Sequence, residues 1–330
     1  MREEKLMKKA IINGLFSLVL VAVFTVPAFA EELIVGGQAV GIQISTEGVL
    51  VAGVNEVETM DGTASPAGDA GVRAGDIIVS IDGKIVYDSA SVVDAVDSAG
   101  DGPVTVKLRR DSKSLELELQ PAESDEGRKM LGLLLRDGMS GIGTLTFFEP
   151  DSGLYGALGH SVNDGESKQE MPIRDGSITK ANIISVKAGA AGNPGELNGA
   201  ADLSQVLGSI EKNTGVGIFG RLYTNLEGQL METGAMTAGP ASIVSTVSGN
   251  ERREYSIEIN RVYRESGGTY AMLTVTDTEL LSRTGGIVQG MSGSPIIQNG
   301  KLVGAVTHVF VNDPTRGYGI FIENMLDAAG

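Results

Sequence analysis

The chain has 330 residues, with 42 acidic and 26 basic side chains, 46 glycines and no cysteine. This length can bury two modest cores. The strongly acidic balance excludes nucleic acid as a partner, and the lack of cysteine excludes disulfides, thiolate metal sites and cysteine nucleophiles. Abundant glycine between short β-branched runs predicts a mostly β protein.

Residues 1–30 have the pattern of an export signal. Basic residues precede an apolar run over residues 10–26, which ends in Pro27-Ala28-Phe29-Ala30. Small residues at 28 and 30 suit a signal peptidase, whereas the apolar run is also a borderline membrane anchor. We expect this segment to direct export, with cleavage and retention as the two alternatives.

Residues 32–121 are predicted to form short strands and one helix. A strand begins at Val40, and a buried strand over 77–81 precedes an Asp82-Gly83 hairpin turn. Val92, Val93 and Val96 have helical spacing within 89–99, with Ser89 as the expected N-cap. Two further strands are expected over 104–109 and 114–119, and the charged segment 122–130 is predicted to be a linker.

This segment resembles a PDZ domain, chiefly through the run Ala74-Gly75-Asp76-Ile77-Ile78. The resemblance implies that a peptide tail is captured by strand addition. The alternative is a spacer domain that binds nothing. The residues expected to bind the peptide are Val40, Gly41, Ile42, Gln43 and Val93.

A serine between glycines stands in the run Gly290-Met291-Ser292-Gly293-Ser294-Pro295, directly before a predicted hairpin around Asn299-Gly300. Glycine lets the backbone turn sharply, so that amides can converge beside the hydroxyl. The pattern predicts Ser292 as a nucleophile, with the amides of Gly290 and Ser292 as its oxyanion hole. A glycine-serine surface loop is the alternative.

The chain has two histidines, His160 and His308, so a histidine-dependent serine hydrolase has only two possible bases. His308 ends the strand that leaves the predicted hairpin, and we expect it in the wall of the substrate cleft. No metal-binding motif occurs in the sequence, and no metal or other cofactor is expected.

The runs 286–295 and 305–314 closely resemble the SpoIVB peptidases, the sporulation-signalling serine proteases of endospore-forming bacteria. The nucleophile loop also resembles that of chymotrypsin-like proteases, with Met291 and Ser294 as departures. The resemblance implies a chymotrypsin-like double β-barrel over residues 131–330. It assigns the base to His160, which ends a Gly-Ala-Leu-Gly-His motif, and the orienting carboxylate to Asp277.

For Asp277 a turn residue at the end of a strand is the alternative, and Asp202 and Asp175 are reserve candidates for the carboxylate. The resemblance further implies an exported endopeptidase that works between the two membranes around the forespore. Its expected substrate is a membrane-anchored regulator of an intramembrane protease. Self-association and self-cleavage near the N-terminus are also expected.

Two other classes of protein remain open. A carboxyl-terminal processing protease also combines a PDZ domain with a serine nucleophile, but it uses a lysine base. A PDZ adaptor whose second domain is a catalytically dead protease scaffold is the other alternative.

Overall fold

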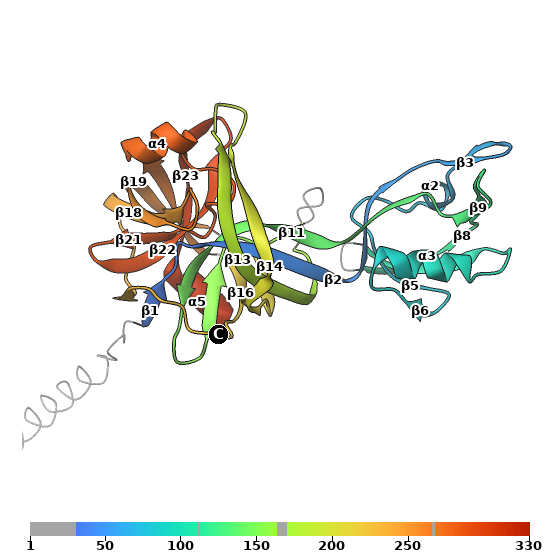
Figure 1. Cartoon of the computed structure of the whole chain (residues 1–330), viewed down its shortest axis with the longest axis horizontal. Helices are drawn as coiled ribbons and strands as arrows, with labels where there is room; N and C mark the ends of the chain where they lie inside the picture. The colour runs from blue at the N-terminus through green and yellow to red at the C-terminus, as the bar shows by residue number, and fades with distance from the viewer. Residues whose placement is uncertain (1–30, 111–112, 164–169, 266–267) are drawn as a thin grey trace, which may run out of the picture. The chain divides into compact units, whose positions relative to one another are not determined.

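The computed structural model describes residues 31–110, 113–163, 170–265 and 268–330 (Figure 1). The predicted export signal of residues 1–30 lies outside the described residues. Among the helices that are described, none is long and apolar enough to cross a membrane. The architecture is mostly β, with barrel-like sheets in the C-terminal part, as the sequence predicted.

The predicted PDZ segment forms a small sheet and two helices around its own core. Val92 and Val96 of one helix are buried there with Ile78 and Val106 of the sheet. The elements are the second half of β2 (Ala39–Val54), β3 (Val57–Thr59), β4 (Gly62–Ala64), α2 (Pro66–Asp69), β5 (Ile77–Ile81), β6 (Lys84–Ile85), α3 (Ser89–Asp97), β7 (Val104–Arg110), β8 (Lys113–Leu119), β9 (Ala122–Glu123) and β10 (Lys129–Met130).

The hairpin turn and the helix of this segment follow the prediction, with one correction. Asp82 and Gly83 both have positive φ, 47° and 74°, and they connect β5 to β6. The N-cap of α3 is Asp88 rather than Ser89, because the Asp88 carboxylate accepts the amide of Ser91 while the Ser91 hydroxyl accepts the amide of Asp88.

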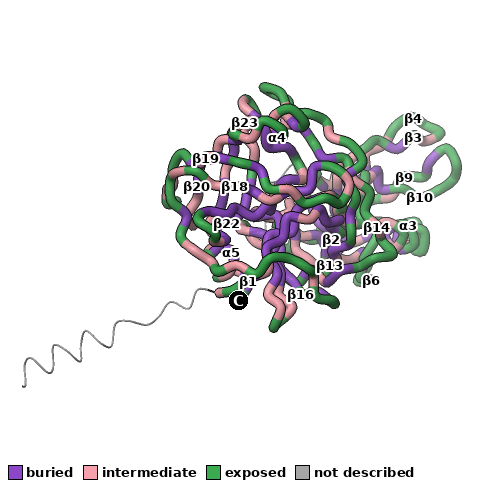
Figure 2. The backbone as a smooth tube through the Cα atoms, turned by 60° about the vertical axis from the view of Figure 1, so that its left-hand side comes forward, coloured by how far each residue is buried: buried purple, intermediate pink, exposed green. Residues whose placement is uncertain are grey.

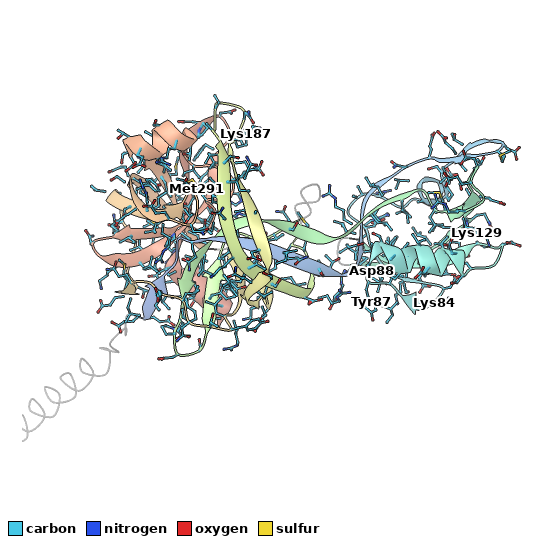
Figure 3. All side chains as sticks on the ribbon, viewed as in Figure 1. Lys84, Tyr87, Asp88, Lys129, Lys187 and Met291 are labelled. Atoms are coloured by element: carbon cyan, nitrogen blue, oxygen red, sulfur yellow. The ribbon has the colours of Figure 1, made fainter. Side chains whose placement is uncertain are left out.

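Residues 122–130 were predicted to be a linker, but they form the β9–β10 hairpin. The Lys129 ammonium donates to the carbonyls of Ala99 and Gly100, just beyond the end of α3 (Figure 3). Ser124 is buried, and Leu131 enters the core of the small sheet. The charges of this segment therefore face solvent or cap the helix, while the hairpin pairing, the buried Ser124 and the adjoining Leu131 hold it in place.

The predicted PDZ domain began at residue 32, but the structure pairs its first residues with strands of the C-terminal part. β1 (Glu32–Val35) pairs with β11 (Leu133–Phe148) and β17 (Leu230–Glu232). The first half of β2 pairs with β13 (Ile173–Lys187), and its second half pairs with β5. Because β2 is one continuous strand of 16 residues, its apolar pattern contains no break that marks the boundary.

The first barrel-like sheet contains β11 and the first half of β2 at its centre. β12 (Leu154–Ala157), β16 (Gly217–Arg221) and β15 (Lys212–Thr214) continue it beyond β11, and β13 and β14 (Glu196–Ser209) continue it beyond β2. An antiparallel bridge from Gly208 to Leu222 brings the two ends together. Its core includes Leu145, Phe148, Tyr155 and Ile178.

The second sheet is a closed six-stranded barrel that contains the predicted serine hairpin. Asn299 and Gly300, with φ of 53° and 72°, connect β21 (Pro295–Gln298) to β22 (Lys301–Phe310), which confirms the predicted tight turn. Buried stretches run through the barrel strands in Figure 2, whereas the connecting loops are exposed. The other strands are β18 (Gly239–Thr246), β19 (Arg252–Glu265), β20 (Gly268–Val275) and β23 (Asp313–Phe321).

Two helices of this part were not predicted. α4 (Thr278–Thr284) follows β20 and ends at Gly285, which has the left-handed φ of 72° typical of a helix C-terminus. α5 (Ile322–Ala329) follows β23 and buries Ile322 and Met325. Both are short, and tertiary contacts contribute more to such helices than intrinsic propensity does.

Candidate active site

The loop that carries Ser292 is shaped by two glycines with left-handed backbone. Gly290 and Gly293 have φ of 95° and 93°. A side chain at Gly293 would lie about 2.1 Å from the carbonyl oxygen of Thr144, so only glycine fits there. Between them, the Met291 side chain is fully buried and anchors the loop in the core of the second barrel (Figure 3).

Strand β11 of the first sheet holds the same loop from the other side. The Thr144 amide donates to the carbonyl of Ser292 (3.0 Å), and its hydroxyl donates to the carbonyl of Gly290 (2.8 Å). The Thr146 hydroxyl donates to the carbonyl of Gly293 (2.8 Å). Three carbonyls of the nucleophile loop are therefore bound to β11.

The amides of Gly290 and Ser292 remain unpaired. Within the described residues neither N–H donates to a protein group, whereas those of Met291, Gly293 and Ser294 do. Two free amides beside a serine hydroxyl are what an oxyanion hole requires. The role predicted for Gly290 and Ser292 requires such unpaired amides, and it stays a prediction.

The two serines of the loop have different surroundings. The Ser292 hydroxyl is partly exposed and donates to the carbonyl of Thr307 on β22 (2.7 Å). Ser294 is fully buried, donates to the carbonyl of Met291 (2.7 Å) and lies 3.0 Å from the hydroxyl of Ser245. Only Ser292 is accessible to a substrate.

His160 follows a sharp turn at the end of β12. Leu158 and Gly159 both have positive φ, 70° and 68°. A side chain at Gly159 would lie 3.1 Å from the Thr307 methyl, so this turn packs directly against β22. The structure thus brings His160 and Ser292 to the same residue, Thr307. It describes both side chains, and no hydrogen bond joins them.

The imidazole of His160 is oriented by a backbone carbonyl. Its Nδ1 lies 2.8 Å from the carbonyl oxygen of Ser161. Burial lowers the pKa of His160 below its ordinary value of 6.5, although the Ser161 hydrogen bond acts in the opposite direction. His160 is therefore neutral near neutral pH, as a general base must be.

His308 lies beside His160. The two rings are 4.6 Å apart between centroids and are tilted by 33°. His308 is an exposed residue by surface area, but desolvation of its ring by neighbouring groups lowers its pKa to about 4, and the nearby His160 adds to the shift. Its place in the wall of a substrate cleft stays a prediction.

Asp277 is not bonded to His160. It is the N-cap of α4, where one carboxylate oxygen accepts the amide of Leu280 (2.9 Å) and the other accepts the amide of Ser256 (3.3 Å). The structure favours the alternative reading, a residue at the end of a strand, over an orienting carboxylate. The reserve candidates are also engaged elsewhere: Asp202 binds Ser204 and Gln205, and Asp175 pairs with Arg174.

Of the residues predicted to bind a peptide, four lie in the first sheet, and only Val93 lies on a helix of the PDZ segment. Val40, Gly41, Ile42 and Gln43 belong to a strand that pairs with β11 on one side and β13 on the other. The prediction of a free edge there is wrong, because the first sheet has already taken both edges. Val93, in contrast, lies on α3 and is 53% exposed.

A free strand edge in the PDZ segment occurs instead at the start of β11. Leu133–Arg136 pairs with β2 on one side, and among the described residues no strand pairs with its other side. The amide of Ser89, at the start of α3, donates to the carboxylate of Asp137, so the helix lies beside this strand. Leu134 on the strand is 51% exposed.

Sequence reasoning missed the partners that assemble the site. Thr144 acts through its amide and short hydroxyl, and Thr307 acts through its carbonyl, both within ordinary strands. Ser161 acts through the carbonyl that follows His160 in the chain. No motif in the sequence marks them, since any residue can supply a carbonyl.

Comparison with known proteins agrees with this geometry. A family model for the SpoIVB peptidase S55 matches residues 127–326, and a PDZ domain model matches residues 62–110. The chain is thus a serine peptidase that carries a PDZ domain. It belongs to the SpoIVB peptidase S55 family, which the resemblance had indicated.

Solved structures provide further likenesses. The Rv3671c protease of M. tuberculosis in its active form is 13% identical, over 58% of this chain and 75% of that one, with a TM-score of 0.34. Its inactive form is 14% identical, over 57% and 84%, with the same TM-score. The PDZ domain of the SdrC-like protein from Listeria monocytogenes is 26% identical, over 28% and 93%, with a TM-score of 0.23. No curated protein sequence matches the chain.

Substitutions at Asp277 separate capping from catalysis. Asparagine caps a helix about as well as aspartate, but it carries no charge. We expect Asp277→Asn to keep kcat within about threefold and Asp277→Ala to lower the free energy of unfolding by about 1 kcal/mol. Peptide hydrolysis and urea unfolding measure the two effects. A loss of 100-fold or more in Asp277→Asn, at unchanged stability, would make Asp277 the orienting carboxylate.

The lowered pKa values of the two histidines predict that the folded protein loses stability in acid. Because their pKa values are lowered on folding, the unfolded chain binds protons that the folded chain does not bind. This loss of stability is absent above about pH 6.5 and grows as the pH falls below that value, for His308 until the pH reaches its folded-state pKa of about 4. We expect the free energy of unfolding of His308→Gln, followed by circular dichroism, to change less between pH 7.5 and 4.5 than that of the wild type. An identical pH dependence would contradict this.

Proposed function

We propose that this chain is an exported serine endopeptidase with Ser292 as nucleophile and His160 as general base. One observation carries the proposal. Ser292 and the turn before His160 both lie against Thr307, with two unpaired amides beside the serine. Ser292 is also the accessible serine of the loop, since Ser294 is buried.

Catalysis begins when the Ser292 hydroxyl leaves the Thr307 carbonyl and turns to Nε2 of His160. Exchanging one neutral hydrogen bond for another costs about 1 kcal/mol or less. The oxygen attacks the scissile carbonyl as its proton moves to Nε2, and the amides of Gly290 and Ser292 bind the resulting oxyanion. The amine then leaves with the proton from Nε2.

Water completes the reaction by the same route. His160 accepts a proton from the water as the water attacks the acyl-enzyme, and the second tetrahedral species again places its oxyanion on the two amides. Collapse releases the carboxylic acid, and the proton returns to Ser292. Every step uses groups of this chain.

The PDZ domain supplies a second contact with the substrate. A peptide tail would add a strand to the free edge of Leu133–Arg136 and place an apolar terminal side chain between that strand and α3. Exposed Val93 and Leu134 are suited to contact it. We propose that the tail belongs to a membrane-anchored regulatory protein or to another copy of this chain.

Family membership supports a cellular compartment and a substrate for this activity. By resemblance to the SpoIVB peptidases, the enzyme would be exported by residues 1–30 and would act between the membranes around the forespore. There it would cleave a regulator of an intramembrane protease. We also propose that it trims its own N-terminal region.

Serine and histidine variants test the catalytic proposal. We expect Ser292→Ala to lower kcat on the order of 10⁶-fold, and His160→Ala to lower it by several orders of magnitude. Ser294→Ala, the matched control in the same loop, should keep most of the activity. The readouts are cleavage of a peptide library and labelling by a fluorophosphonate.

Labelling that persists in Ser292→Ala and disappears in Ser294→Ala would overturn the assignment. Full activity in His160→Ala would point to the lysine-dependent class. The Ser292→Ala protein also tests self-processing, because an N-terminus identical to that of the exported wild type would leave signal peptidase as the sole processing enzyme.

A charge in the PDZ groove tests tail binding. We expect Val93→Asp to raise KM about tenfold for a substrate with an apolar C-terminal tail and to leave an untailed peptide unchanged, because a buried unpaired charge opposes the apolar side chain. Val206→Asp, on β14, is the control at similar exposure, 45% against 53%. If the wild type cleaved tailed and untailed substrates equally well, the groove would have no such role.

A further inference from the structure

The peptide unit between Ser161 and Val162 connects the proposed base to the partly buried amide side chain of Asn213. Its carbonyl oxygen lies 2.8 Å from Nδ1 of His160. Its N–H donates to Oδ1 of Asn213, also at 2.8 Å. One rigid peptide plane is thus hydrogen-bonded to His160 at one end and to Asn213 at the other.

This contact selects one tautomer of His160. A carbonyl oxygen only accepts hydrogen bonds, so Nδ1 must carry the proton. In the neutral ring Nε2 is then the unprotonated nitrogen. That is the nitrogen that must take the proton of Ser292. A carboxylate has this role in the Ser-His-Asp arrangement, but here the carboxylate of Asp277 caps a helix.

Asn213 is held so that it can fix this peptide plane. It lies on β15, paired with Ile218 of β16, and its side chain is partly buried. Besides accepting from the Val162 amide, its Nδ2 donates to the carbonyls of Val162 (2.7 Å) and Met171 (3.0 Å). The amide side chain therefore uses its acceptor and both of its donors on the segment that follows His160.

We propose that Asn213 is a positioning residue for catalysis, acting on His160 through the Ser161–Val162 peptide. This inference rests on the proposed role of His160 as the base. Accepting from the Val162 N–H polarises the same peptide and makes the Ser161 carbonyl a stronger acceptor for Nδ1–H. Asn213 thus keeps Nε2 unprotonated and directed at the nucleophile, although it touches neither the substrate nor Ser292.

Two substitutions of similar size test the proposal. Asn213→Leu removes all three hydrogen bonds, and we expect kcat to fall about 10- to 100-fold with KM changed less than twofold. Asn213→Asp keeps an acceptor for the Val162 N–H but sets an oxygen against the carbonyls of Val162 and Met171, so it should recover at most about tenfold of that loss. Its negative charge favours the imidazolium form, so the acid limb of its pH–kcat profile should move to higher pH. Asn260→Leu, at an exposed site on β19, is the control and should be unchanged.

The tautomer itself can be observed, because the chain has only two histidines. In protein labelled with ¹⁵N-histidine, loss of one signal set in His308→Gln assigns the other set to His160. The wild type should show a neutral ring with the proton on Nδ1. Asn213→Leu should shift the ring toward a mixture of tautomers, which a purely structural role would not do.

If both Asn213 variants lost kcat equally, with the acid limb and the tautomer unchanged, Asn213 would only hold the loop and the proposal would be wrong. If Asn213→Leu failed to fold, the acid limb and the tautomer in Asn213→Asp would decide in the same way. Failure of the proposed function looks different, since His160→Ala and Ser292→Ala would then remain active whatever happens at Asn213.

Discussion

The hydrogen bonds from Thr144 and Thr146 of β11 to the nucleophile loop are the constraint on which the site depends. They bind the carbonyls of Gly290, Ser292 and Gly293, and leave the amides of Gly290 and Ser292 unpaired. Each of these carbonyls shares its peptide plane with the N–H of the next residue, so the bonds fix the planes that carry the paired amides of Met291, Gly293 and Ser294. The first sheet therefore holds the loop between β20 and β21 in which the proposed oxyanion-hole amides of Gly290 and Ser292 lie.

The same first sheet supplies His160, so the catalytic groups meet only where the two sheets meet. Burial at this junction keeps the His160 imidazole neutral, and the neighbouring His160 adds to the cost of charging His308. In the resting arrangement the Ser292 hydroxyl is bound to Thr307 rather than to His160. The proposed mechanism exchanges this hydrogen bond for one to Nε2 of His160.

Strands β2 and β11 serve both parts of the protein. They pair with each other from Ala39 and Thr144 in the first sheet to Val54 and Leu133 in the PDZ segment, with register shifts near Gly138. The residues before Ser45 and after Gly138 contribute to the protease, whereas Leu133–Arg136 presents a free edge beside α3. A strand added to that edge would lie on the same β11 that holds the nucleophile loop.

The sequence by itself determined the local features whose causes are local. Positive φ at Asn299-Gly300 and Asp82-Gly83 produced the predicted hairpins, apolar spacing produced α3, and the glycines around Ser292 marked the nucleophile loop. The scarcity of histidine also restricted the base to two residues, which the structure places side by side. These signals depend on the residue itself or on neighbours a few positions away.

The tertiary structure alone decided which partners those residues meet. The apolar pattern of β2 does not indicate which sheet each half of the strand joins. Val40–Gln43 was therefore assigned to a peptide groove, although β11 and β13 pair with it. An aspartate before a helix can cap it or orient an imidazole, and only the positions of Leu280 and Ser256 favour capping for Asp277. The contacts of Thr144, Thr307 and the Ser161 carbonyl join segments through backbone atoms, which every residue has, and so no pattern of side chains could have announced them.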